Sequence, residues 1–330
     1  MKVIHGGGVW ETGNPAEWLD FSANLRPEGP PEWVMEALKS TLDDIRYYPD
    51  LHMARARRGL AGFLGLPEDR ILPTAGGTAA IDLALERNRG CVYTREHAFG
   101  EYARRAEAHT RRHGLWDGAC GAGDTLILSN PDNPTGRAET KEELFSLHDR
   151  LYRSGAELIV DEAFIDYCPE FSLREHIRPG LTIVGSLTKI LGIPGVRLGY
   201  LCAVPEAIRT LEERMLPWSL GTQAAEIAAR LPEHREEIRR DAETNARHRE
   251  VFARRLEQLG AETAPSRSSF LLADFRRDMT EPAEQLKARG ILVRTCASFG
   301  LGNSVLRLAV KTEAENERLA AALEEILHAR

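Results

Sequence analysis

Three polar residues that could take part in chemistry recur at a constant interval along the chain. Asn133, Asp161 and Lys189 lie 28 positions apart, and each comes after a short apolar run. An amine can act as a nucleophile, a carboxylate can hold a positive charge, and an amide can donate and accept hydrogen bonds. Because this interval is about one strand–helix unit, we expect the three side chains at the same edge of a parallel sheet, where such sheets bind ligands.

Each of the three residues also has a simpler structural explanation. Lys189 could be a solvated strand end, Asp161 a helix N-cap and Asn133 part of an ordinary turn. Equal spacing at one sheet edge favours a shared chemical role over three coincidences.

A pair of glycines marks a second candidate site, one for an anion. Gly76, Gly77 and Thr78 precede a predicted helix, and free amides at a helix N-terminus bind anions. A plain tight turn is the alternative. The groups that could complete the anion site flank Lys189 and are Ser186, Thr188 and Arg197. Phe99 could stack on a bound ring, although most such aromatic residues belong to a core.

The elements that must position these residues alternate between strands and helices. From residue 71 to about residue 205, apolar strands are separated by helical stretches, which predicts an α/β fold with a mostly parallel central sheet covered by helices. The strands that lead to the three polar residues are the most regular and span 125–129, 157–160 and 181–184. Shorter helices are expected before this region, over 30–42 and up to residue 64.

Beyond residue 205 the pattern predicts a smaller α+β domain. Residues 206–258 are rich in Glu, Arg and Ala and are typical of long helices, which Pro217 must interrupt. Two strands, 269–274 and 305–310, and a closing helix over 313–327 follow. We therefore expect an N-terminal arm with a helix packing on the small domain, a large domain and a small C-terminal domain, with the bounds 1–45, 46–220 and 221–330.

Length and composition restrict the class of protein. The chain has 330 residues and a net charge of −7, which suits two domains and argues against a nucleic-acid partner. Its five cysteines include no C-x-x-C pair, so we expect neither a disulfide framework nor a metal site. The first residues lack the apolar core of a signal peptide, and no apolar run is long enough to span a membrane. A cytoplasmic protein without a membrane partner is expected.

Three short motifs surround the polar residues. Residues 186–189 read Ser-Leu-Thr-Lys, and 193–200 read Ile-Pro-Gly-Val-Arg-Leu-Gly-Tyr. Asn-Pro-Thr-Gly stands at 133–136 and Asp-Glu-Ala-Phe at 161–164. These motifs resemble the lysine signature and two further landmarks of the class I/II aminotransferases, fold-type I enzymes that depend on pyridoxal phosphate (PLP). The resemblance extends from His5 to the last helix, and it implies a large PLP-binding domain and a smaller C-terminal domain.

Within that superfamily, several segments are most similar to L-threonine-O-3-phosphate decarboxylase of cobalamin biosynthesis, and next to histidinol-phosphate aminotransferase. These segments are 5–7, 19–27, 217–219 and 293–297. Phe164 stands where the aminotransferases usually have a tyrosine, and the decarboxylase also tends to have phenylalanine there. The resemblance implies a PLP-dependent carboxy-lyase acting on a small phosphorylated amino acid, or an aminotransferase.

The resemblance also implies a role for each candidate residue. Lys189 would form an imine with PLP and act in catalysis, Asp161 would pair with the pyridinium nitrogen, and Asn133 would hold the phenolic oxygen. The residues implied to hold the cofactor phosphate are Gly76, Gly77, Thr78, Ser186, Thr188 and Arg197. Tyr48 resembles a tyrosine that reaches this phosphate from a partner subunit, which implies a homodimer with shared active sites.

Substrate binding is implied for four further residues. Arg307 would bind the substrate carboxylate, and His5 and Arg294 would bind the substrate phosphate with Asn24 nearby. Arg307 lies inside an apolar strand, where an arginine needs an anionic partner, and a structural salt bridge is the alternative. His5 taken alone would be an ordinary frayed terminus.

The chain also departs from the family pattern. Ala75 and Ala79 stand where the phosphate loop usually carries Asn and Glu, and the stretch 102–130 is short. Ser269 stands where an Asn is common in the family. The decarboxylase tends to have another Asn at the position of Leu220 or Gly221, which this chain lacks. These changes make the side chains and one loop at the walls of the site smaller. They leave three functions open: the decarboxylase, a histidinol-phosphate or related aminotransferase, and a catalytically weakened PLP-binding homologue.

Overall fold

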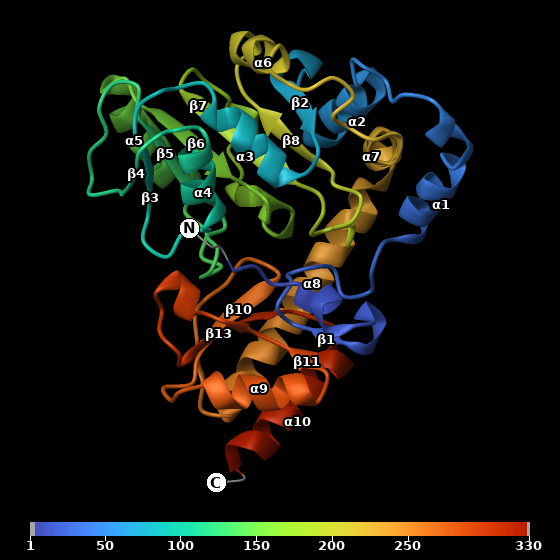
Figure 1. The fold of residues 1–330 in the computed structure, drawn as a ribbon, viewed down its shortest axis with the longest axis vertical. Helices are drawn as coiled ribbons and strands as arrows, with labels where there is room; N and C mark the ends of the chain where they lie inside the picture. Colours follow the sequence, from blue (N-terminus) through green and yellow to red (C-terminus); the bar gives the residue numbers. More distant parts are fainter. Residues whose placement is uncertain (1–3, 329–330) are drawn as a thin grey trace.

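A seven-stranded sheet forms the upper part of the molecule in the computed structural model, which describes residues 4–328 (Figure 1). In spatial order its strands are β2 (Ile71–Thr74), β8 (Gly199–Cys202), β7 (Leu181–Ser186), β6 (Glu157–Asp161), β5 (Thr125–Ser129), β3 (Val92–Thr94) and β4 (His113–Leu115). Strand β8 is antiparallel to both of its neighbours, and the other pairs are parallel. The predicted mostly parallel sheet is confirmed.

The central strands are buried because helices cover the sheet. All residues of β5 and β7 are buried, and so are those of β6 after Glu157, as expected for continuous apolar runs. Helix α3 (Gly77–Leu85) packs on β7 and β8, and α5 (Lys141–Arg153) packs on β6. A capping box between Thr140 and Glu143 starts α5. The other helices around this sheet are α1 (Glu32–Ser40), α2 (Ala54–Leu64), α4 (Glu101–Ala108), α6 (Pro205–Glu212) and α7 (Thr222–Arg230).

A four-stranded antiparallel sheet forms the lower part (Figure 1). Its strands are β12 (Arg294–Thr295), β13 (Val305–Ala309), β10 (Phe270–Asp274) and β9 (Glu262–Thr263). Three helices belong to this part, namely α8 (Arg235–Gln258), α9 (Thr280–Ala288) and α10 (Glu313–His328). The N-terminal strand β1 (Leu19–Asp20) pairs in parallel with β11 (Ile291–Leu292), which ties the N-terminal arm to this part.

Two hydrophobic cores underlie the two sheets, and they meet within α8. Ala242 belongs to the large core around the central sheet, whereas Phe252 belongs to the small core around β10 and β13. The large core therefore extends past the expected boundary at residue 220, because α7 and the first half of α8 fill it. Helix α1 packs on α7, which lies within the expected bounds 221–330, and it buries Trp33 and Val34 in the large core.

One glycine lets β8 pass directly beneath the start of α3. A Cβ on Gly199 would lie 2.6 Å from the carbonyl carbon of Gly76 and 2.7 Å from the carbonyl oxygen of Gly185. Any side chain at Gly199 would push the N-terminus of α3 away from the sheet. This close approach is what brings the free amides of α3 to the edge where β5, β6 and β7 end.

Short 3₁₀ turns connect the longer elements. They are η1 (Gly8–Thr12), η2 (Pro15–Glu17), η3 (Asp43–Arg46), η4 (Glu68–Arg70), η5 (Ile165–Tyr167), η6 (Pro169–Phe171), η7 (Arg174–His176), η8 (Leu231–His234) and η9 (Ala297–Phe299). Pro217 falls between α6 and α7, so the predicted interruption is confirmed. Over residues 4–328, no helix has the length and apolar character needed to cross a membrane.

Candidate active site

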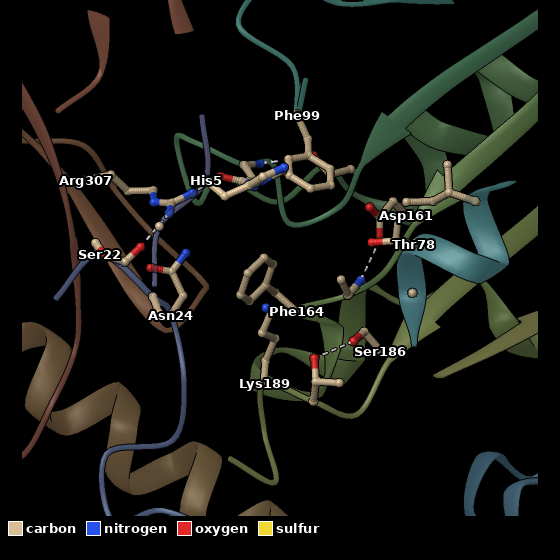
Figure 2. Close-up of a pocket in the computed structure, with 18 of the residues that line it drawn as sticks. His5, Ser22, Asn24, Thr78, Phe99, Asp161, Phe164, Ser186, Lys189 and Arg307 are labelled. Carbon is tan, nitrogen blue, oxygen red and sulfur yellow. Dashed lines mark hydrogen bonds between the residues drawn. The ribbon is translucent and has the colours of Figure 1, made fainter. Parts of the chain in front are cut away.

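The strands β5, β6 and β7 end at one cavity of about 190 Å³ (Figure 2). Asn133, Asp161 and Lys189 all line it, so the equal spacing does bring the three side chains to one sheet edge. The predicted site residues that line this cavity are His5, Asn24, Gly77, Thr78, Phe99, Asn133, Asp161, Ser186, Thr188, Lys189, Arg197 and Arg307. In Figure 2, Arg307, Ser22 and Asn24 lie on one side, and Asp161, Thr78 and Ser186 lie on the other.

Three predicted site residues lie outside this cavity. Gly76 lies behind the guanidinium of Arg197, since a Cβ on Gly76 would come 2.6 Å from Arg197 Nη2. Arg294 lines an adjoining cavity. Tyr48 is 79% exposed and stacks on Trp218 with 4.6 Å between ring centroids, so within one chain it does not reach the site.

Asp161 is a buried carboxylate held by two donors. The Tyr102 hydroxyl donates to Asp161 Oδ2 at 2.7 Å, and the Ala163 amide donates to Oδ1 at 3.0 Å. Burial raises the pKa of Asp161, while these hydrogen bonds and the charge of Lys189 act against the rise. Asp161 thus also caps the turn after β6, but its second oxygen faces a cavity. A cation placed there would favour the ionised form.

Lys189 is a buried amine with a lowered pKa. Burial lowers the pKa to about 8, and the positive charges of Arg307 and Arg197 add to the effect, whereas Asp161 opposes it. The backbone of Lys189 is anchored because its carbonyl accepts a hydrogen bond from the Arg26 amide at 3.0 Å. At neutral pH a fraction of this amine is unprotonated and able to act as a nucleophile.

Amides, hydroxyls and a cation converge beside Lys189 to form an anion site. Helix α3 starts at Gly77 and presents its N-terminal amides, and Thr78 lies in its first turn. Ser186 Oγ and Thr188 Oγ1 are 2.8 Å apart at the same wall. Arg197 has a left-handed backbone with φ of 63°, a conformation that is costly for a residue with a side chain. That conformation accompanies the placement of its guanidinium over Gly76.

Arg307 projects from β13 into the opposite wall of the cavity. Its Nη1 donates to Asn133 Oδ1 at 2.6 Å and its Nη2 donates to the Ser22 carbonyl at 3.0 Å, while its Nε is buried without a partner. Burial lowers the pKa of Arg307 to about 10. Among residues 4–328 no carboxylate forms an ion pair with it, so the alternative of a structural salt bridge is not supported.

A smaller cavity of about 80 Å³ adjoins the first and shares His5 and Arg307 with it. Arg294 lines this smaller cavity. Its Nη2 donates to the Ile4 carbonyl at 2.9 Å and to Ser298 Oγ at 2.6 Å. Both acceptors are neutral, and burial lowers the pKa of Arg294. Two arginines with only neutral partners therefore face a space large enough for one small anion.

Residue patterns did not single out three side chains of the site. Tyr102 bonds to Asp161, Glu101 accepts a hydrogen bond from His5 at 2.9 Å, and Ser22 lines the cavity. Glu101 and Tyr102 directly follow Phe99 and Gly100 in the sequence, which is the one signal that could have drawn attention to them.

Comparison with known proteins identifies the family. The fold is that of the fold-type I PLP-dependent enzymes, and the aminotransferase class I and II family model matches residues 116–323. The threonine-phosphate decarboxylase of Salmonella typhimurium is 33% identical over 99% of this chain and 97% of its own length. A histidinol-phosphate aminotransferase of Moorella thermoacetica is 28% identical over 94% of this chain and 85% of its own length. The chain belongs to the class I and II aminotransferase family, a PLP-dependent family of enzymes.

Solved structures share the fold. The histidinol-phosphate aminotransferase from Clostridium acetobutylicum has a TM-score of 0.86 at 23% identity, over 94% of this chain and all of its own. The L-threonine-O-3-phosphate decarboxylase from Porphyromonas gingivalis has a TM-score of 0.83 at 24% identity, over 94% and 99%. The histidinol-phosphate aminotransferase from Sinorhizobium meliloti, in complex with pyridoxal-5'-phosphate, has a TM-score of 0.83 at 21% identity, over 93% and 90%.

The residues present fit PLP by their chemistry. The cavity has an amine for the aldehyde, a carboxylate for the ring nitrogen and a helix N-terminus with hydroxyls and a guanidinium for the phosphate. The phosphate wall is tightly packed at Gly77, since a Cβ there would lie 3.1 Å from Ser186 Cβ. Buried polar atoms without partners, Arg307 Nε and Asn24 Oδ1, remain on the opposite side. They leave hydrogen-bonding capacity for a second molecule.

Proposed function

We propose that this enzyme decarboxylates a small phosphorylated amino acid, namely L-threonine O-3-phosphate. One observation carries the proposal. Arg307 and Arg294, both with only neutral partners among the described residues, line adjoining cavities next to Lys189. Two cations in adjoining cavities, one of which also holds the amine, suit a substrate with both a carboxylate and a phosphate. The similarity to the Salmonella decarboxylase over nearly the whole chain supports the same substrate.

In this proposal the large domain holds the cofactor. Lys189 is the residue that bonds to PLP, Asp161 faces the ring nitrogen, Asn133 faces the phenolic oxygen, and Phe99 stacks on the ring. The residues that hold the cofactor phosphate are Gly76, Gly77, Thr78, Ser186, Thr188 and Arg197, with Tyr48 of a second subunit. PLP supplies an electron-accepting ring, which stabilises negative charge at the substrate α-carbon.

The substrate side orients the bond that breaks. Arg307 holds the carboxylate at the wall formed with Ser22 and Asn24, and Arg294 and His5 hold the phosphate in the smaller cavity. Because burial strengthens these charge-assisted hydrogen bonds, the two anchors fix the orientation of the α-carbon between them. The amine of Lys189, with its pKa of about 8, is suited to deliver a proton to that carbon at neutral pH.

Side-by-side assays of the purified holoenzyme test the proposal. L-threonine O-3-phosphate is expected to release CO2 and to form aminopropanol phosphate faster than histidinol phosphate is transaminated. Glutamate formation with 2-oxoglutarate, without CO2 from threonine or serine phosphate, would instead assign the aminotransferase reaction of the Moorella relative. Turnover of none of these compounds would favour a weakened homologue.

We also propose a homodimer with shared sites. Several large apolar side chains are exposed together around Tyr48, namely Tyr47, Leu51, Leu216 and Trp218, and exposed apolar patches commonly mark interfaces. Sedimentation should give a dimer. Mixing and refolding Tyr48→Ala with Lys189→Ala subunits should restore about a quarter of wild-type activity, because half of the dimers then carry one intact site. No recovery above the sum of the two parents would contradict shared sites.

A further inference from the structure

Residues 4–7 form a strap beside the two cavities, and His5 and Gly6 line both of them. The Ile4 carbonyl accepts from Arg294 of the small sheet, and His5 Nε2 contacts Glu101 Oε1 of α4 at 2.9 Å. The Gly7 amide donates to Ser22 Oγ at 2.8 Å, and Gly6 packs so closely on Ser22 that no side chain would fit there. The strap is therefore fixed from the large domain, the small sheet and the N-terminal arm at once.

Glu101 is a buried carboxylate at the first position of α4. It is only 3% exposed, and its oxygens accept hydrogen bonds from Arg104 Nε at 2.9 and 2.8 Å. Burial by itself would raise the pKa of Glu101, but the hydrogen bonds and charges of Arg104 and His5 outweigh it, and the net pKa is lowered. Glu101 thus stays ionised, and its place at the N-terminus of α4 favours the charge further.

The contact with Glu101 holds the His5 imidazole through its Nε2 atom. His5 lines both cavities, and its ring meets Phe99 edge-on with 5.9 Å between centroids. Because Nε2 is engaged by the carboxylate, Nδ1 is the nitrogen left for a ligand. Among residues 4–328, Glu101 supplies the polar contact that the half-exposed His5 side chain makes with the large domain.

We propose that Glu101 is a positioning residue that holds His5 over the small cavity, so that the imidazole and Arg294 close around the phosphate of a phosphomonoester substrate. The inference rests on the proposed function, since it assigns the phosphate to this cavity. Glu101 does not touch the substrate. It acts through His5, in the way that a carboxylate orients an imidazole in other sites.

A double-mutant cycle on the holoenzyme tests this proposal. Binding of L-threonine O-3-phosphate and of L-threonine is titrated by cofactor absorbance for the wild type, Glu101→Leu, His5→Ala and the double variant. Glu101→Leu should weaken the phosphorylated ligand about tenfold and leave L-threonine unchanged, because one charge-assisted contact is lost. The double variant should lose no more than His5→Ala alone. Glu101→Gln should retain part of the affinity, since its carbonyl can still accept from His5.

Glu142→Leu is the matched control, because Glu142 is an exposed carboxylate in the first turn of another helix, α5. It should bind both ligands as the wild type does. Losses from Glu101→Leu and His5→Ala that multiply in the double variant, or an equal loss for L-threonine, would overturn the positioning role.

A second readout separates this inference from the proposed function. Amide hydrogen exchange of the N-terminal peptide, measured without substrate, should rise in Glu101→Leu and stay at the wild-type rate in Glu142→Leu. The titrations are repeated with histidinol phosphate and histidinol. A wild type that prefers neither phosphorylated compound defeats the proposed substrate class, and the exchange data then still report on the strap. Unchanged exchange in Glu101→Leu defeats the strap itself.

Discussion

The two sides of the active site that we propose, one for the cofactor and one for the substrate, are built in different ways. The cofactor side comes from the ends of β5, β6 and β7 and the start of α3, all within one sheet and one core. The substrate side is assembled from the strap, the arm around Ser22 and the small sheet, which are far apart in the sequence (Figure 2). The first side is set by local strand–turn–helix geometry, whereas the second exists only when both cores are docked. The difference suggests that substrate choice can change while cofactor chemistry stays the same.

The two sides also differ electrostatically. On the cofactor side, opposite charges share one cavity, and Asp161 and Lys189 moderate each other's pKa shifts. On the substrate side, Arg307 and Arg294 are cations whose pKa values are lowered, and Arg294 contributes to lowering that of Arg307. The substrate side therefore carries positive charge that a bound anion would neutralise. Variants on each side should show this difference in charge.

The largest effect is expected from Lys189→Ala on the cofactor side. Loss of the amine removes the covalent bond to the cofactor and the acid–base group, so turnover should fall by at least about 10³-fold. Borohydride reduction followed by mass spectrometry should find the pyridoxyl adduct on Lys189 in the wild type and on no lysine of the variant. Lys287→Ala, an exposed lysine on α9, should keep the adduct. An adduct on another lysine would refute the central assignment.

Arg307→Gln should act mainly on the substrate side, with a smaller effect on the cofactor side because the charge of Arg307 helps to lower the pKa of Lys189. Loss of a buried cation facing an anion costs roughly 2–5 kcal/mol, or about 30- to 5 × 10³-fold in KM. Cofactor retention, measured by absorbance after gel filtration, should stay at the wild-type level. A variant that also sheds its cofactor would show that the two sides are not independent.

Asp161→Asn should show the opposite pattern. The amide can still accept a hydrogen bond but cannot balance a positive charge on the ring, so kcat should fall about 100-fold while KM changes little. Steady-state kinetics with an absorbance check for bound cofactor would measure both. Near-normal turnover would mean that Asp161 only caps the turn after β6.

A pH dependence follows from the lowered pKa of Lys189. Because the pKa is about 8, the amine is neutral above that pH and is protonated as the pH falls through it. The rate of cofactor capture by the apoprotein should therefore drop about tenfold from pH 9 to pH 7 and level off above pH 8. A lysine with its ordinary pKa would instead give a drop of about 100-fold with no plateau. Stopped-flow absorbance distinguishes the two profiles.

Tyr102→Phe should give the smallest effect. The change deletes one hydrogen bond to Asp161, worth about 1 kcal/mol, so kcat should fall about fivefold with unchanged KM for the substrate. Tyr152→Phe, which alters an exposed tyrosine on α5, is the control and should behave as the wild type. A rise in KM without a change in kcat would place Tyr102 on the substrate side.

The sequence was sufficient for the cofactor side because its information is local. Each polar residue follows an apolar strand by a few positions, so sheet edge and spacing together predict the convergence of Asn133, Asp161 and Lys189. The contacts of Glu101 and Tyr102 were missed because they join residues 96 and 59 positions apart, and helix periodicity carries no signal for such partners. The place of Gly76 behind Arg197 depends on a left-handed arginine, which composition does not reveal.

The packing of the N-terminal region was harder to predict for a similar reason. The amphipathic pattern over 30–42 predicts which face of the helix is buried but not the core on which that face packs. In the structure, α1 packs on α7 and belongs to the large core. The large core reaches beyond residue 220 because α8 is one continuous helix whose two halves belong to different cores. No break in composition marks the change between Ala242 and Phe252.

The small core is made from two parts of the chain that are far apart in the sequence, and this has a consequence for its assembly during translation. Leu19 and Phe21 leave the ribosome well before their packing partners, which lie between residues 252 and 327. The members of the large core lie between Trp33 and Phe270, so that core can close while the remainder is still being translated. The pocket for the cofactor is thus complete earlier than the pocket for the substrate. During that interval the apolar side chains of Leu19 and Phe21 lack their native partners in the small core.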